Sequence, residues 1–259
     1  MRKFFALLIF VLFIVSGVYA SDMRFIQLSD IRYTDANKQV LSDAISEINK
    51  EKDVEFVVFT GDNLKRPSKQ DLESFLKVIK KINSPVYIVL GDKDVNKYKD
   101  LGKQDYVNIV HKNLRSYKPK TSNYVFEKQG VVFIVLDGSK EVITSTVGYY
   151  RDDILAWLDE QLKKTEGKNV VILQHFPIIP PAEKEMYYTY KPENYLKILA
   201  ANKNIKAVVS GHFGVNKEIT KDGVVHISTS GLPYYRVIDI LDSDTENPVI
   251  WAQLKKLGN

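Results

Sequence analysis

Five apolar runs of the chain are each followed by an aspartate or a histidine. Runs rich in Val, Ile and Phe that stop at turn residues are typical of buried strands. The residues that follow these runs are Asp30, Asp62, Asp92, His175 and His212. In an open α/β sheet, ligands bind in the crevice beyond the carboxyl ends of the strands. Asp and His both bind divalent metal ions, so the sequence predicts a metal site at the strand ends.

Each of these residues alone also has a plain structural explanation. The aspartates fit turns after strands, because Asp is a common turn residue. The histidines fit a core in which they have hydrogen-bond partners. The repeated position at a strand end favours a site over five separate coincidences. His111, in a helical stretch, and His226, within a strand, have no partner motif, and we expect both to be structural.

The spacing of these residues resembles the motifs of the calcineurin-like metallophosphoesterase superfamily. The family pattern is D-x-H, G-D, G-N-H-D/E, H and G-H-x-H, in that order, at strand ends. The corresponding series here is Asp30, Gly61-Asp62-Asn63, Gly91-Asp92-Lys93-Asp94, His175 and Gly211-His212. The resemblance implies an α/β fold, a four-layer α-β-β-α sandwich with two mixed β-sheets. It also implies hydrolysis of phosphoesters at a pair of divalent metal ions.

Three motifs depart from the family pattern. The last residue of the first motif is Arg32, Asp92 and Lys93 stand where the third has Asn and His, and the last residue of the fifth is Gly214. Arginine has no free lone pair for a metal ion at accessible pH, and glycine offers only its backbone. The resemblance therefore implies a degenerate metal site.

One metal position is complete by this resemblance, and the other is not. The complete position has Asp62, Asp92, His175 and His212, two carboxylates and two imidazoles that suit Mn, Fe or Zn. The other keeps only Asp30 and the shared Asp62. We therefore expect one divalent metal ion rather than two.

Arg32 and Lys93 are the predicted catalytic side chains. Three aspartates and one divalent ion leave a net negative charge, which would repel a phosphate ester, and the two cations reverse that sign. Arg32 lies two residues after Asp30, so we expect its guanidinium to reach the incomplete metal position and to bridge Asp30 and Asp62. The alternative is that the site has decayed and that these side chains have no role.

The elements that position these residues alternate in the first half of the chain. Apolar residues recur at helical spacing in 40–48 and 68–82, between the runs that end at Asp30, Asp62 and Asp92. Strand–helix–strand units of this length require parallel strands. Ser68 can cap the second helix.

The second half predicts hairpins and two further helices. Hairpins are expected around Lys-Gln-Gly at 128–130 and around Asp-Gly at 222–223. The last two strands, 235–241 and 249–254, are expected to form an antiparallel end. Helical patterns cover 152–164 and 192–201. The segment 186–190, Met-Tyr-Tyr-Thr-Tyr, either lines a substrate entrance or packs a long loop onto the sheet edge.

Residues 1–20 are predicted to be a signal peptide, and 21–259 a single domain. The segment has a basic start, an apolar run at 4–15 and Val-Tyr-Ala at 18–20, with small residues where signal peptidase reads. An uncleaved membrane anchor is the alternative, although the run is short for a span. We expect an exported protein, periplasmic or extracellular, which without any Cys forms no disulfides.

The charge pattern gives no strong signal for nucleic acid. The net charge of +5 is spread along the chain, without the interleaved aromatics of a nucleic-acid platform. The expected partner is a phosphate ester or another phosphorylated substrate, with membrane contact only through an uncleaved N-terminal segment. The sequence predicts an exported, metal-dependent phosphoester hydrolase with a single-metal site. The alternative is a non-catalytic relative that binds a phosphorylated ligand or a protein partner.

Overall fold

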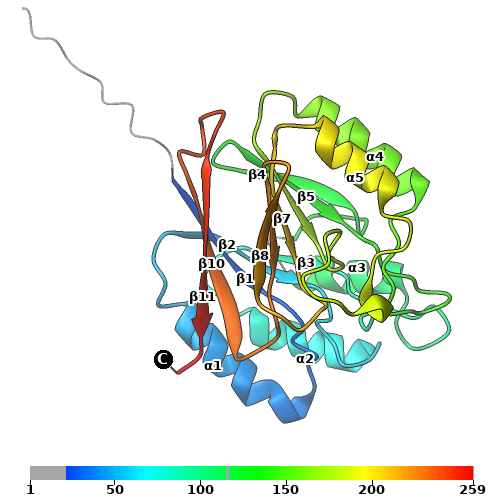
Figure 1. Cartoon of the computed structure of the whole chain (residues 1–259). Helices are drawn as coiled ribbons and strands as arrows, with labels where there is room; N and C mark the ends of the chain where they lie inside the picture. The colour runs from blue at the N-terminus through cyan, green and yellow to red at the C-terminus, as the bar shows by residue number, and fades with distance from the viewer. Residues whose placement is uncertain (1–21, 115–116, 259) are drawn as a thin grey trace, which may run out of the picture.

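The computed structural model describes residues 22–114 and 117–258. The predicted signal peptide therefore lies outside the described residues. Two β-sheets lie face to face, and helices cover their outer faces (Figure 1). The predicted four-layer α-β-β-α sandwich with two mixed sheets is confirmed.

The first sheet has the order β11-β10-β1-β2-β3. Its parallel strands are β1 (Met23–Leu28), β2 (Val54–Thr60) and β3 (Val86–Val89). The antiparallel end consists of β10 (Tyr234–Leu241), which pairs with β1, and β11 (Val249–Lys256). The last segment of the chain thus returns to the strand with which the domain begins.

Helices α1 (Lys38–Ile48) and α2 (Lys69–Ile79) form the crossovers between the parallel strands of this sheet and cover its outer face (Figure 1). The short helix η1 (Asp35–Asn37) precedes α1. The predicted cap is present, because the Asp71 backbone N donates to Ser68 Oγ at 3.1 Å. Helix α3 (Lys103–Asn113) packs beside α2.

The second sheet has the order β4-β5-β6-β7-β9-β8. Its strands are β4 (Tyr124–Lys128), β5 (Val131–Leu136), β6 (Val170–Gln174), β7 (Ile205–Ser210), β8 (Lys217–Lys221) and β9 (Val224–Ser228). Strands β5, β6, β7 and β9 are parallel, and both edge strands are antiparallel. The outer face packs on α4 (Asp152–Lys164) and α5 (Glu193–Ala201). The connection before α5 contains the short helix η2 (Glu185–Tyr187).

Both predicted hairpin turns are present and have left-handed backbone at their centres. The φ angles are 46° at Gln129 and 77° at Gly130 in the first, and 52° at Asp222 and 83° at Gly223 in the second. Such positive values favour glycine or a short polar residue, which the turn sequences supply.

Aromatic rings hold the two sheets together. Phe25 and Phe56 of the first sheet stack with ring centroids 4.8 Å apart. Phe133 of the second sheet meets Phe56 edge-on at 4.8 Å, and Phe126 stacks on Phe133 at 5.0 Å. Aromatic pairs at such distances add to the stabilisation from burial. They fix one sheet relative to the other, which matters because the site lies across both.

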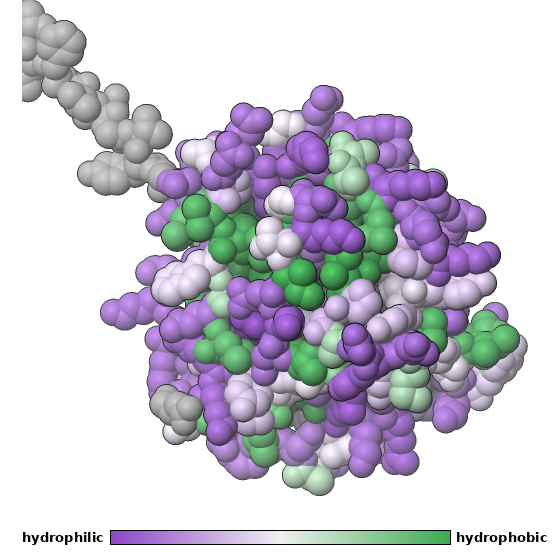
Figure 2. Space-filling model, in the orientation of Figure 1, coloured by the Kyte–Doolittle hydropathy of each residue, from purple (hydrophilic) through white to green (hydrophobic). Residues whose placement is uncertain are grey.

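The surface in Figure 2 is mainly hydrophilic, with hydrophobic side chains in scattered patches. Within residues 22–114 and 117–258, no helix is long and apolar enough to cross a membrane.

Candidate metal centre

All five predicted metal ligands meet at one edge of the sandwich. Asp30 and Asp62 follow β1 and β2, Asp92 lies in the loop after β3, and His175 and His212 follow β6 and β7. His175 Nε2 lies 3.1 Å from His212 Nδ1 and 3.4 Å from an oxygen of both Asp62 and Asp92. Asp92 Oδ1 lies 3.3 Å from His212 Nδ1. The first sheet thus contributes the carboxylates and the second the imidazoles.

Two of the glycines in the motifs are required by this close approach. A Cβ on Gly61, which has φ 92°, would lie 2.5 Å from His175 Nδ1. A Cβ on Gly91 would lie 2.2 Å from the backbone N of Asp62. Real Cβ atoms do not approach other atoms so closely, so any side chain here would push the ligand residues apart.

The orientation of the His175 ring is fixed by a hydrogen bond from Nδ1, the nitrogen that faces away from the carboxylates. Its Nδ1 donates to the carbonyl oxygen of Thr60 at 2.8 Å, so its Nε2 faces the carboxylates. Burial acts to lower the pKa of His175, but Asp62, Asp92 and Asp30 together outweigh it and raise the pKa to about 10. In the absence of a metal ion the imidazolium balances the carboxylates, and a bound ion would displace that proton.

The two aspartates at the complete position differ in their environment. Asp62 is fully buried, and burial is the main reason why its pKa is raised. Burial would also raise the pKa of Asp92, but His175 and His212, whose ring nitrogens lie 3.4 and 3.3 Å from its Oδ1, bring it below its ordinary value. Burial lowers the pKa of His212, which favours the neutral form that binds metals.

These residues fit a divalent metal ion. Asp62 Oδ2 and Asp92 Oδ1 are buried and have ion-pair contacts, but neither accepts a hydrogen bond from the described residues. Buried carboxylate oxygens without hydrogen bonds are costly, and a divalent ion between them and the imidazoles would offset that cost. Two carboxylates and two imidazoles would hold Mn, Fe or Zn. The convergence of Asp92, His175 and His212, and of Asp30, Asp62 and His175, supports this fit.

Arg32 contacts the carboxylate oxygen of Asp62 that does not face His175. Its Nη2 is 3.4 Å from Asp30 Oδ1 and 3.6 Å from Asp62 Oδ2, so the guanidinium bridges the two carboxylates. The remaining oxygen of Asp30 accepts hydrogen bonds from Ser29 Oγ at 2.7 Å and from the backbone N of His212 at 2.9 Å. The side chain of Arg32 is 45% exposed, so part of the guanidinium remains accessible to a ligand.

Lys93 is the second cation of the centre. Its Nζ lies 2.9 Å from Asp92 Oδ2 and 3.2 Å from Asp62 Oδ2. Burial acts to lower the pKa of Lys93, but the charges of Asp62 and Asp92 raise it above its ordinary value. A firmly held proton suits a fixed positive charge better than a proton donor to a leaving group.

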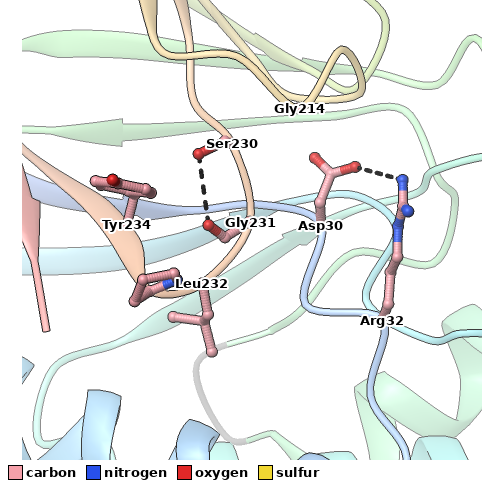
Figure 3. A pocket seen from close by; sticks show the side chains of 8 residues that line it. Asp30, Arg32, Gly214, Ser230, Gly231, Leu232 and Tyr234 are labelled. Carbon is pink, nitrogen blue, oxygen red and sulfur yellow. Dashed lines mark hydrogen bonds and ion pairs between the residues drawn. The ribbon is translucent and has the colours of Figure 1, made fainter.

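Gly214, the third departure from the family motifs, borders a cavity of about 280 Å³ next to Arg32. The φ of Gly214 is 64°, and apart from its chain neighbours no atom of the described residues lies within 4 Å of the place where its Cβ would be. The cavity is shown in Figure 3 and is lined by Asp30, Arg32, Gly214, Ser230, Gly231, Leu232, Pro233 and Tyr234.

Sequence reasoning left the role of segment 186–190 open. The loop does pack, since Thr189 Oγ1 donates to the carbonyl oxygen of Pro177 at 3.0 Å. It also reaches the site, because the Tyr187 ring lies 4.9 Å from the His212 ring. A contact between a loop and a distant ligand has no local sequence signal beyond the aromatic composition itself.

Asp94, the last residue of the third motif, has a structural role in the centre. It is fully buried and accepts hydrogen bonds from the backbone N of Leu64 and Gly91, at 2.9 and 2.8 Å, and from Asn63 Nδ2 at 3.0 Å. It thereby ties the loop after β3 to the loop after β2. His111 and His226 are not among the clustered residues.

A four-layer sandwich with Asp and His gathered at its strand ends is the arrangement of a metallophosphoesterase. The sequence profile of the calcineurin-like phosphoesterases matches residues 23–216. The protein therefore belongs to the calcineurin-like phosphoesterase family, and the resemblance found in its motifs is confirmed.

Individual relatives are distant. A probable cyclic nucleotide phosphodiesterase of Fibrobacter succinogenes is 27% identical over 188 residues, which are 69% of this chain and 65% of that protein. The structure of a dimetal phosphatase from Danio rerio matches with a TM-score of 0.65 at 16% identity. The match covers 91% of this chain and 99% of the phosphatase chain. The structure of the anchor in the inner membrane complex of Plasmodium matches with a TM-score of 0.62 at 14% identity. The match covers 92% of this chain and 90% of the anchor chain. At such identities the two structures show the fold alone.

Proposed function

We propose that this protein is an exported phosphoester hydrolase that works with one divalent metal ion, Mn, Fe or Zn. The observation that carries the proposal is the position of Arg32, whose guanidinium bridges Asp30 and Asp62 on the side where a second ion would need ligands. Asp62, Asp92, His175 and His212 would hold the single ion. Its Lewis acidity would polarise a phosphoryl oxygen and make water more acidic.

The chain's own cations attract and orient the substrate. Arg32 presents a partly exposed, planar fork of N–H donors, which suits phosphoryl oxygens. Lys93 contributes a second positive charge, held by Asp62 and Asp92. Together they offset the aspartates, so that an anionic ester is attracted.

Metal analysis combined with a hydrolysis assay tests this proposal. The purified protein, loaded with excess Mn, Fe or Zn and desalted, is expected to retain about one equivalent per chain, since only one position has a full ligand set. It is expected to hydrolyse an aryl phosphodiester, the first class to test because the Fibrobacter relative is named a probable phosphodiesterase. Two retained equivalents would contradict the single-metal site.

A second candidate function is phosphate-dependent binding without turnover. It is favoured by Lys93, whose raised pKa makes it a poor proton donor, at the position where the family motif has an imidazole. A protein of this fold serves as an anchor in Plasmodium. Thermal stabilisation by inorganic phosphate, with no hydrolysis of monoesters or diesters by metal-loaded protein, would select this candidate.

Export is tested on protein from the native host. Cleavage after residue 20 would give a mature chain that begins at Ser21. Mass spectrometry of the intact protein decides between this outcome and a retained anchor, which would keep the full N-terminal mass.

A further inference from the structure

The cavity beside Arg32 has two chemically different sides. Asp30 and Arg32 form a charged side, and their ion pair is drawn in Figure 3. Leu232, Pro233 and Tyr234 form an apolar side, with the Tyr234 ring well away from the guanidinium in that view. A ligand that spans this cavity would need an anionic end and an apolar end.

The apolar side is fixed relative to the charged side. A Cβ on Gly231 would lie 2.7 Å from the carbonyl oxygen of Asp30, so the loop that contains Gly231 packs directly against the backbone of Asp30. Ser230 is tied down as well, since its N and Oγ donate to Asn216 Oδ1 at 2.9 and 3.1 Å. The fold therefore fixes the positions of both sides of the cavity.

Gly214 keeps the cavity open. The space around its Cβ position is free of atoms within 4 Å, and the residue borders the cavity. A larger side chain at this position would project into that space. The same departure from the family motif that removes a metal ligand thus leaves room for part of a ligand.

We infer that this cavity holds the organic group of a phosphoester whose phosphoryl group lies at Arg32, and that this organic group is a single flat aromatic system. The inference rests on the proposed function. The apolar lining of Leu232, Pro233 and Tyr234 includes an aromatic side chain, and this favours a ring over an alkyl chain. A volume of about 280 Å³ lies at the small end of ligand sites, which suits one ring system rather than a polymer.

Two phosphonates that resist hydrolysis test the inference by calorimetry on metal-loaded protein. Phenylphosphonate and methylphosphonate share the charged end and differ in the ring. We expect phenylphosphonate to bind about tenfold more tightly, because the ring is buried on binding. Tyr234→Ala should bring the ratio of the two Kd values toward one, and Tyr234→Phe should retain it. Tyr98→Ala, at an exposed tyrosine outside the cavity lining, is the matched control.

A second variant approaches the cavity from its other side. Gly214→Asn adds volume at a position whose positive φ Asn tolerates, so the phenyl preference should fall there too. Equal affinity of the parent for both phosphonates would overturn this inference but leave the proposed function standing. A phenyl preference that survives both Tyr234→Ala and Gly214→Asn would also overturn it. If neither phosphonate binds the parent, phosphoryl recognition fails, and the proposed function falls together with the inference.

Discussion

Arg32 and Lys93 share one carboxylate, because both have a nitrogen within 3.6 Å of Asp62 Oδ2. Asp62 is fully buried, so its charge interacts strongly with any partner close by. A carboxylate in this position needs cations nearby to remain ionised. Arg32 and Lys93 supply two such cations, and the proposed metal ion would supply a third.

His175→Ala and His212→Ala should each weaken metal binding by more than about 100-fold, the upper range for loss of an outer partner of a ligand. Each variant removes one of the four donors at the complete position. Metal content after desalting, together with competition against a chelator, measures the loss. His111→Ala, at an exposed histidine away from the cluster, is the control and should hold metal like the parent. Parent-like retention by both ligand variants would refute the assignment of this centre.

Arg32→Ala should reduce the rise in Tm that inorganic phosphate produces, because it removes the partly exposed guanidinium that faces the cavity. Without phosphate it should lower Tm by about 2–4 °C, the effect of about 1 kcal/mol, since Asp30 and Asp62 lose their shared partner. Thermal melts with and without phosphate measure both effects. Arg24→Ala breaks an ion pair with Asp239 and should keep the full phosphate shift. An undiminished shift in Arg32→Ala would favour a decayed site.

Arg32→His combined with Gly214→His should raise the retained metal from about one to about two equivalents, because it completes the second ligand set of the family pattern. The space at position 214 is open, and His tolerates positive φ better than most residues. Arg32→His with Gly214→Ala is the matched control, with the same backbone change but one ligand fewer. If the double His variant still retains one equivalent, the second position lacks the family geometry.

At the scale of elements, most of the architecture could be predicted from local signals. Glycine at a strand end marked Asp62, Asp92 and His212, and turn residues marked both hairpins. Ser68 marked the start of α2, and its oxygen accepts the expected hydrogen bond. Strand limits moved by a few residues, as with β11, which ends at Lys256 rather than at 254. Such limits depend on pairing with neighbouring strands, which no local pattern encodes.

Strand β9 contains a buried histidine outside the metal centre. Burial lowers the pKa of His226 to about 4, and the charge of Lys221 adds to this while Asp222 opposes it. The unfolded chain takes up the proton near pH 6.5, well before the folded chain does. Stability should therefore fall as pH drops from about 6.5 to about 4, by about 3 kcal/mol at most, and should not depend on this group above that range.

The variant His226→Gln should flatten that part of the pH dependence. Urea unfolding at pH 7, 5.5 and 4.5 gives the slope for parent and variant. His111→Gln changes an exposed histidine and should leave the slope as in the parent. An unaltered slope in His226→Gln would mean that other groups cause the loss of stability in acid.

At the scale of the whole molecule, the centre is assembled from distant parts of the chain, which limits what sequence can predict. Tyr187 reaches His212 from a loop, and the cavity joins Gly214 to the segment before β10. No periodicity or turn signal reports such contacts, because they depend on how the two sheets dock. The family resemblance supplied the ligands of the centre but not the cavity beside them.

The division of the centre between the two sheets has a consequence for folding kinetics. Asp30 and His212 are 182 positions apart, yet the backbone N of His212 donates to Asp30 Oδ2 at 2.9 Å. Neither sheet alone contains the full ligand set, so an ion can be captured only after the sheets have docked. Metal should then slow unfolding without accelerating refolding, because it stabilises contacts formed after the transition state. Stopped-flow refolding that is faster with metal would show that the two halves meet early.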